Sequence, residues 1–246
     1  MSVLEGLGGR RGFRTAGLGL PVFLIAFCIL SEGLHADVSA GDTSAVCGDA
    51  PAALERMQTR YDEIQDLSAV FTQVSESVVL AGSAPQEASE SAGTVVLAKP
   101  GRMRWSYEEP DPSLVVSNGE QLWIYDVTAK QVTRASVGQG YLAGAALQFL
   151  LGEGRLRDLF EVEEVACSDE AVELELRPRA SASYEKIRAT VDHQSGLVSE
   201  TSVYDLFGNR TILRFRDIVL NESPEAAVFV FEKPEEVELI DMGIVP

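Results

Sequence analysis

The sequence predicts a mainly β (α+β) protein built on one antiparallel sheet that forms an open or partly closed barrel. Segments of alternating hydrophobicity, separated by turn residues, fill most of the chain. One amphipathic helical segment precedes them, and a second helical segment near the middle is apolar almost all round. No internal repeat or linker divides the chain of 246 residues, so we expect a single domain after the N-terminal region.

The first forty residues have the layout of an export signal. Three arginines among residues 10–14 precede an uncharged stretch from Thr15 to Ser31, and small residues at Ala36 and Ala40 offer two cleavage sites. An uncleaved membrane anchor is the alternative interpretation. The paired arginines leave both the general secretory and the twin-arginine export routes open. The expected division is a signal peptide, residues 1–36, with cleavage after Ala36 or Ala40, and one domain, residues 37–246.

The expected mature chain is strongly acidic. Removing residues 1–36 deletes three arginines and two glutamates, which leaves 17 basic and 36 acidic side chains and a net charge of −19. Phosphate binding needs clustered Lys and Arg, so this charge argues against a nucleic-acid partner. Anionic membrane surfaces should also repel the protein as a whole. Charge of this size keeps a protein with much apolar surface in solution.

Two of the three cysteines would remain after cleavage. Cys28 lies in the apolar part of the signal, and lipid attachment there would need a small residue where Phe27 stands. Cys47 and Cys167 are candidates for a disulfide, because an exported protein enters an oxidising compartment. Two separate free thiols are the alternative. The cysteine spacing fits no metal site.

The first helical segment begins near residue 50. Asp49 can cap it and Pro51 suits its first turn. Strands are expected next, from Ala69 to Leu80 and from Gly93 to Ala98, with a Gly/Ser/Glu-rich loop over residues 81–92 between them. The apolar stripe of the helix consists of Leu54, Met57, Tyr61 and Ile64.

An apolar hairpin follows. Met103 and Trp105 alternate with polar residues on a strand that ends before Pro110. Asn118-Gly119 is a favoured centre for a two-residue turn, which would pair Val115 with Leu122. Both faces of this hairpin are apolar, so we expect it to be covered on both sides. One face carries Val115, Leu122 and Ile124, and the other carries Leu114, Val116, Trp123 and Tyr125.

The second helical segment is expected from Gln139 to Phe160. Its centre, Ala143 to Leu151, is apolar nearly all round, so it must be buried or must cover another apolar surface. Gly152 and Gly154 interrupt it. More strands with polar outer faces follow, which predicts one solvent-exposed and one buried face for this half of the sheet. They are Val172–Leu176, Ser183–Val191, Leu197–Asp205, Arg210–Leu220 and Val228–Phe231, before an acidic tail, Glu232–Pro246.

Catalytic groups are poorly represented. The expected mature chain has a single histidine, His193, which lies next to Asp192 in a turn signal. No serine lies in a Gly-x-Ser-x-Gly setting, and no glycine-rich phosphate loop occurs. We therefore expect no enzyme and no cofactor. Two interpretations of the abundant apolar surface stay open: an ordinary core capped by helices, or a wall around a cavity for an apolar ligand.

The order of these segments resembles the periplasmic outer-membrane lipoprotein carrier (LolA) family. The match covers most of the expected mature chain and is densest between residues 64 and 160. Each segment alone is a weak signal, but the combination is specific. The segments are IQDLSAVFTQ at 64–73, KPGRMRWSY at 99–107 with Pro110, LVVSNGEQLWIYD at 114–126, QVT at 131–133 and FLLG at 149–152.

The resemblance implies a fold and a function. The fold would be a single unclosed antiparallel β-barrel with a helical lid over an apolar concave face. The protein would be a monomeric, non-catalytic periplasmic chaperone that binds the acyl chains of lipoproteins. It would receive them from an inner-membrane ATP-driven release complex and pass them to an outer-membrane receptor lipoprotein.

The resemblance also implies roles for particular residues. The family holds its lid with an arginine immediately before a proline; here Lys99 precedes Pro100, so Lys99 or Arg102 would be the lid latch. Met103 and Trp105 match cavity positions, and Leu147, Phe149 and Leu150 fall in the lid. The full set of expected lipid-binding residues is Met103, Trp105, Leu114, Val116, Trp123, Tyr125, Leu147, Phe149 and Leu150.

Two other functions remain alternatives. The first keeps the fold but not the role: a lipid-anchored lipoprotein acceptor, with lipid on Cys28, or an envelope-stress sensor. The second is a periplasmic hydrolase that uses Asp192 and His193.

Overall fold

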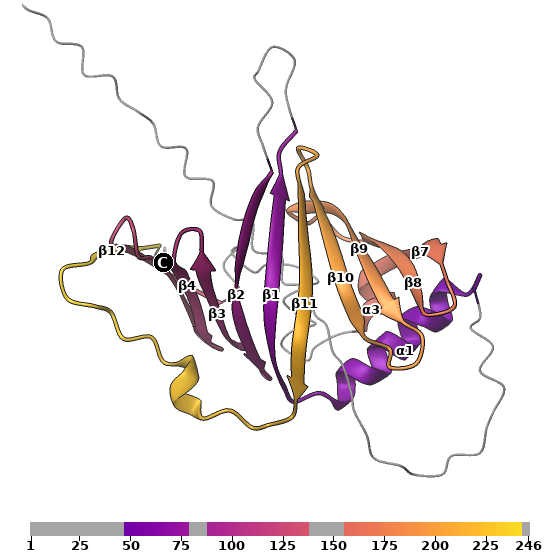
Figure 1. Cartoon of the computed structure of the whole chain (residues 1–246), viewed down its shortest axis with the longest axis horizontal. Helices are drawn as coiled ribbons and strands as arrows, with labels where there is room; N and C mark the ends of the chain where they lie inside the picture. Colours follow the sequence, from indigo (N-terminus) through magenta and orange to yellow (C-terminus); the bar gives the residue numbers. More distant parts are fainter. Residues whose placement is uncertain (1–46, 79–87, 138–154, 243–246) are drawn as a thin grey trace, which may run out of the picture.

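A computed structural model describes residues 47–78, 88–137 and 155–242 (Figure 1). Twelve strands form one sheet in the order β12-β6-β5-β4-β3-β2-β1-β11-β10-β9-β8-β7. In this part of the chain β7 and β12 are the two edges and do not pair, so the sheet is unclosed. The predicted class, a mainly β protein with one unclosed antiparallel sheet, is confirmed. The strands are β1 (Asp66–Glu76), β2 (Ser89–Ala98), β3 (Arg102–Glu109), β4 (Ser113–Asn118), β5 (Gln121–Asp126), β6 (Gln131–Ser136), β7 (Phe160–Cys167), β8 (Ala171–Pro178), β9 (Tyr184–Asp192), β10 (Val198–Asp205), β11 (Arg210–Leu220) and β12 (Glu238–Asp241).

The sheet is strongly curved. Trp105 on β3 and Phe215 on β11 are separated by two strands, yet their ring centroids lie 6.0 Å apart. In a flat sheet, three strand spacings would separate these residues by about 14 Å. We call the face that carries these two rings the inner face and the opposite one the outer face.

Helix α1 (Ala50–Glu63) closes one end of the inner face. Asp49 Oδ1 accepts a hydrogen bond from the Ala52 N–H at 2.9 Å, which caps the first turn as predicted. The helix packs against β7, β8 and a short helix, α3 (Leu156–Leu159), at the right of Figure 1. Gln58 Oε1 accepts from the Leu156 N–H at 2.8 Å. The predicted stripe Leu54, Met57, Tyr61 and Ile64 is buried in this contact.

The inner face and α1 share one hydrophobic core. Along β9, Ile187, Ala189 and Val191 are buried, whereas Arg188 and Thr190, which alternate with them, are only partly buried. This alternation is the predicted pattern of one dry and one wet face. No helix in the described ranges combines the length and the apolar character needed to cross a membrane.

The β4–β5 turn is longer than predicted. Val115 pairs with Ile124 rather than with Leu122. The Asn118 side chain accepts hydrogen bonds from two later backbone N–H groups, at 2.9 and 2.8 Å, and Gly119 has φ +97°. The side chain of Asn118 thereby closes a wider turn than Asn-Gly alone would make. The register moves by two positions, so each residue keeps its predicted face.

Other predicted boundaries were wrong in detail. Strand β2 begins at Ser89, inside the segment expected to be a loop, because its polar residues extend the ladder with β1. Of the helical segment expected from Gln139 to Phe160, the described part contains only α3, and Phe160 already belongs to β7. The remainder, 138–154, lies outside the described residues.

The chain after β11 differs most from its prediction. The strand expected at Val228–Phe231 is wrong: a 3₁₀ helix, η1 (Ala226–Phe229), stands there and contacts β3 and β4. The acidic tail then adds β12, which pairs in parallel with β6 and forms the edge of the sheet. Figure 1 shows this C-terminal segment, residues 221–242, returning in yellow along the first half of the sheet.

Candidate functional site

An aromatic cluster occupies the centre of the inner face. Phe71 on β1 lies 4.8 Å from Trp105 and 5.0 Å from Tyr107, measured between ring centroids, and Phe215 meets Trp105 from β11. Trp105 is 2% exposed and Phe71 is fully buried. Buried apolar side chains on the same and neighbouring strands belong to the same hydrophobic core: Leu67, Val95, Leu97, Met103, Val115 and Leu213.

One buried polar contact interrupts this apolar surface. The Tyr107 hydroxyl donates to Gln73 Oε1 at 2.8 Å. Burial raises the pKa of Tyr107, and the nearby Trp105 indole N–H opposes that rise. The phenol therefore stays neutral and donates at any ordinary pH. The buried side chains of the cluster are uncharged and offer contacts for apolar molecules.

The nine expected lipid-binding residues do not lie together. Met103 and Trp105 are on the inner face, with Trp105 opposite Val115. Because side chains alternate along a strand, the other four hairpin residues point the opposite way. The pairs Leu114–Tyr125 and Val116–Trp123 lie on the outer face, and the three lid residues Leu147, Phe149 and Leu150 lie outside the described residues.

The C-terminal segment covers the outer face of the hairpin. The Phe231 ring stacks on Trp123 at 6.1 Å and meets Tyr125 at the same centroid distance. Phe229 is buried, and Arg104 donates from Nη1 to the Val228 carbonyl at 3.3 Å. The second apolar face of the hairpin is therefore packed against the chain itself. A signal for this cover was present in the sequence as the aromatic pair Phe229 and Phe231.

The two candidate latch residues point in different directions. Lys99 Nζ donates to the Tyr61 carbonyl in the last turn of α1 at 2.6 Å, and burial lowers its pKa while Asp62 opposes the change. Arg102 donates from Nη2 to the Lys99 carbonyl at 3.0 Å, and its guanidinium lies 5.2 Å from the centre of the Phe229 ring. Lys99 therefore sits at the helix end of the inner face, and Arg102 belongs to the outer face.

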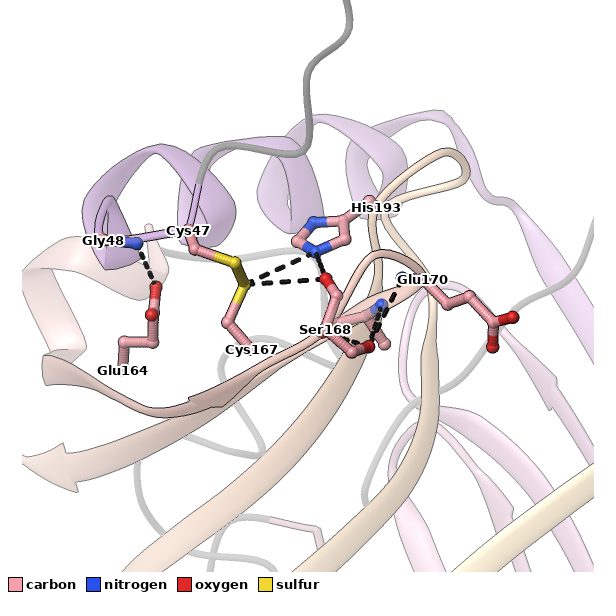
Figure 2. Close-up of a disulfide and its surroundings, with 8 residues drawn as sticks. Cys47, Gly48, Glu164, Cys167, Ser168, Glu170 and His193 are labelled. Carbon is pink, nitrogen blue, oxygen red and sulfur yellow. Dashed lines mark hydrogen bonds between the residues drawn. A yellow bond between two sulfur atoms is a disulfide. The ribbon is translucent and has the colours of Figure 1, made fainter.

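A disulfide joins Cys47 to Cys167, the pair proposed from the sequence (Figure 2). The Gly48 N–H donates to Glu164 Oε2 at 2.7 Å beside it. These two links tie the start of α1 to the edge strand β7. Cys47, Cys167 and His193 also lie close enough to share a metal ion, but both sulfurs are bonded to each other and offer no thiolate.

The proposed hydrolytic pair has other roles. Asp192 Oδ1 accepts from the N–H groups of Gln194 (3.1 Å) and Ser195 (2.7 Å), which closes the turn. His193 Nε2 lies 3.0 Å from the Ser168 carbonyl oxygen and 3.7 Å from Cys167 Sγ of the disulfide (Figure 2). This arrangement assigns both residues to turn structure.

The curved, unclosed sheet and its aromatic inner face place the chain among half-barrel proteins that present an apolar concave surface. Within that class the family is specific. Residues 62–232 match the model of the family described as "Outer membrane lipoprotein carrier protein LolA", and the chain belongs to this family.

Individual relatives agree with the family match. The chain is 30% identical over 199 residues to an outer-membrane lipoprotein carrier protein of Pseudomonas paraeruginosa, covering 80% of this chain and 92% of the relative. It is 29% identical over 221 residues to the Legionella pneumophila protein of the same name, covering 89% and 98%. Among solved structures, a LolA superfamily protein from Nitrosomonas europaea matches with a TM-score of 0.39 and 15% identity, covering 72% of this chain and 97% of that one.

Proposed function

We propose that this protein is a periplasmic carrier that binds the acyl chains of lipoproteins against its inner face and moves them to the outer membrane. The observation that carries the proposal is the aromatic cluster of Phe71, Trp105, Tyr107 and Phe215 inside an unclosed sheet. The α-helices α1 and α3 pack chiefly at the β7–β8 end of the sheet. Membership of the lipoprotein carrier family supports lipoproteins as the class of cargo.

The cargo explains why such a face is needed. A lipoprotein anchor of three acyl chains holds on the order of 40 methylenes, each worth about 0.8 kcal/mol when removed from water. An anchor exposed in the periplasm would therefore aggregate or insert into the nearest membrane. A half-barrel can shield the chains without making a covalent bond, which fits a non-catalytic role.

We propose a smaller set of lipid-binding residues than the sequence suggested. Met103 and Trp105 contribute from β3, and Leu147, Phe149 and Leu150 contribute from the segment expected to form the lid. Leu114, Val116, Trp123 and Tyr125 hold the C-terminal segment instead. Lys99 is the better latch candidate of the two, because it reaches toward the inner face and Arg102 does not.

The partners follow from the same role. An inner-membrane ATP-driven release complex would load the carrier, and an outer-membrane receptor lipoprotein would unload it. A monomer suffices, because one inner face receives one anchor. The signal-peptide layout of residues 1–36 supports export to the periplasm.

The test is binding of a fluorescent triacylated lipopeptide to the oxidised mature protein, with the deacylated peptide as control. We expect saturable binding of the acylated peptide alone. Met103→Glu should abolish binding, since it places a carboxylate on the inner face, whereas Leu114→Glu on the outer face should retain it. Equal binding of both peptides, or loss in Leu114→Glu with Met103→Glu unaffected, would contradict the proposal.

A further inference from the structure

The most exposed large apolar side chains of the described residues lie at one hairpin tip. Leu206 is 64% exposed and Phe207 is 85% exposed, both in the turn between β10 and β11. Val78, just beyond β1, is 49% exposed and lies against the same turn, close to Gly208. In Figure 1 this hairpin stands at the upper rim of the sheet. We call Val78, Leu206 and Phe207 the apolar tip.

The turn that carries the tip is firmly built. Asp205 Oδ1 accepts from the N–H groups of Phe207 at 2.8 Å and Asn209 at 2.9 Å. Asn209 Nδ2 donates to the other Asp205 oxygen at 2.7 Å, and its Oδ1 accepts from the Val78 N–H at 2.9 Å. Gly208 supplies the positive φ of +86°. Polar groups alone hold the turn, so its geometry does not require two large apolar residues at the apex.

We propose that the apolar tip inserts into the headgroup region of a lipid bilayer, so that the carrier docks on membrane surfaces through it. The tip is convex and consists of three side chains, far less than the surface of about 800 Å² per partner that a stable protein interface uses. A bilayer needs no complementary groove, and its interface accepts a protruding aromatic side chain next to a polar backbone.

The charges around the tip favour brief contact. Arg210 and Glu76 form a two-pronged ion pair at the base of the hairpin, with both distances 2.9 Å, so these two charges cancel, whereas the Asp205 carboxylate accepts only from neutral groups of the turn. The whole chain carries a net charge of −18, which repels it from anionic lipid. Attraction by two or three apolar side chains against this repulsion gives weak, reversible docking. The biological need for such docking rests on the proposed function, because an acylated cargo starts and ends in a membrane.

The experiment measures partition of the oxidised mature protein onto phosphatidylcholine vesicles by flotation, with and without phosphatidylglycerol. Leu206→Ser/Phe207→Ser should lower the partition coefficient at least tenfold, since each apolar side chain contributes about that factor. The matched control is Val230→Ser, which removes an apolar side chain that is 55% exposed on the C-terminal segment. It should change partition less than twofold if the tip is the docking element. Phosphatidylglycerol should weaken binding of the unaltered protein, and added salt should restore it.

The outcomes separate this inference from the carrier proposal. Vesicle binding that is lost in the tip variant, with lipopeptide binding in solution unchanged, supports the docking role. Equal partition of the unaltered protein and the tip variant, or no partition by either, overturns it. If the tip variant instead loses transfer to a purified receptor protein in the absence of vesicles, the tip serves a protein partner and the bilayer assignment is wrong. Failure of lipopeptide binding in every variant would count against the carrier function alone.

Discussion

Breaking the Cys47–Cys167 disulfide should destabilise the native state by about 5 kcal/mol at 25 °C. The two cysteines are 120 residues apart in sequence, so the bond closes a long loop in the unfolded chain. In the chain-entropy model, the lost entropy grows with the logarithm of loop length and gives about 5 kcal/mol for a loop of this size. A typical disulfide contributes about 2–4 kcal/mol, so the contribution of this one should lie above that range.

The assay is equilibrium unfolding in urea, followed by tryptophan fluorescence. Three samples are compared: the oxidised protein, the same protein reduced with a phosphine, and the Cys47→Ser/Cys167→Ser variant. The reduced protein and the variant should unfold at the same, lower urea concentration and with a steeper dependence on urea, because their unfolded chains are more extended. The phosphine should not affect the variant. If the reduced protein and the double-serine variant both lose less than about 1 kcal/mol of stability, the argument is refuted, because the loop-closure entropy of the unfolded chain predicts several times more.

Two further changes test the outer face. Phe231→Ala should cost about 2 kcal/mol of unfolding free energy, less than a full core truncation because Phe231 is half-buried, and should leave lipopeptide affinity unchanged; lost affinity at unchanged stability would contradict the division into two faces. Glu175→Gln should cost about 3 kcal/mol at pH 7, since the buried carboxylate of Glu175 contacts Arg177, Lys186 and Arg188. Burial alone would raise the pKa of Glu175, but these cations together lower it. The ionised carboxylate therefore stabilises the native state fully above the unfolded pKa of 4.5, and this contribution disappears as the pH falls through the lower pKa of the native state. The gap in stability between the two proteins should therefore shrink in urea titrations below about pH 4.5, and a gap that widened on acidification would show that the sign is wrong.

Local sequence patterns were sufficient to predict much of the fold. The apolar stripe and cap of α1 depend on neighbours within a few residues, and both are present in the structure. Alternation along the β4–β5 hairpin assigned each side chain to its face even though the register was wrong. An error of two positions preserves the period of two, so face assignments tolerate it.

Local patterns could not predict that the expected lipid-binding residues would be divided between the inner and the outer face. The hairpin sequence showed that both faces needed cover, but not which cover each would receive. Trp123 and Tyr125 contact Phe231, which lies far downstream, beyond six further strands. A contact between such distant segments depends on the path of the whole sheet, and no periodicity within either segment records it. The strands expected to end at Asp205 and to begin at Arg210 likewise predicted a turn between them, but not how far Leu206 and Phe207 would be exposed there.

The two tryptophans of the chain provide the most direct test of the central claim, that lipid binds to the inner face only. Trp105 lies on the inner face and Trp123 on the outer face, so each can report separately. The measurement is quenching of tryptophan emission by a lipopeptide with brominated acyl chains, which quench only at short range. In Trp123→Phe, where Trp105 alone emits, saturating lipopeptide should quench strongly; in Trp105→Phe, where Trp123 alone emits, it should quench little. Strong quenching of Trp123 with Trp105 unaffected would show that the lipid lies on the outer face and would contradict the account.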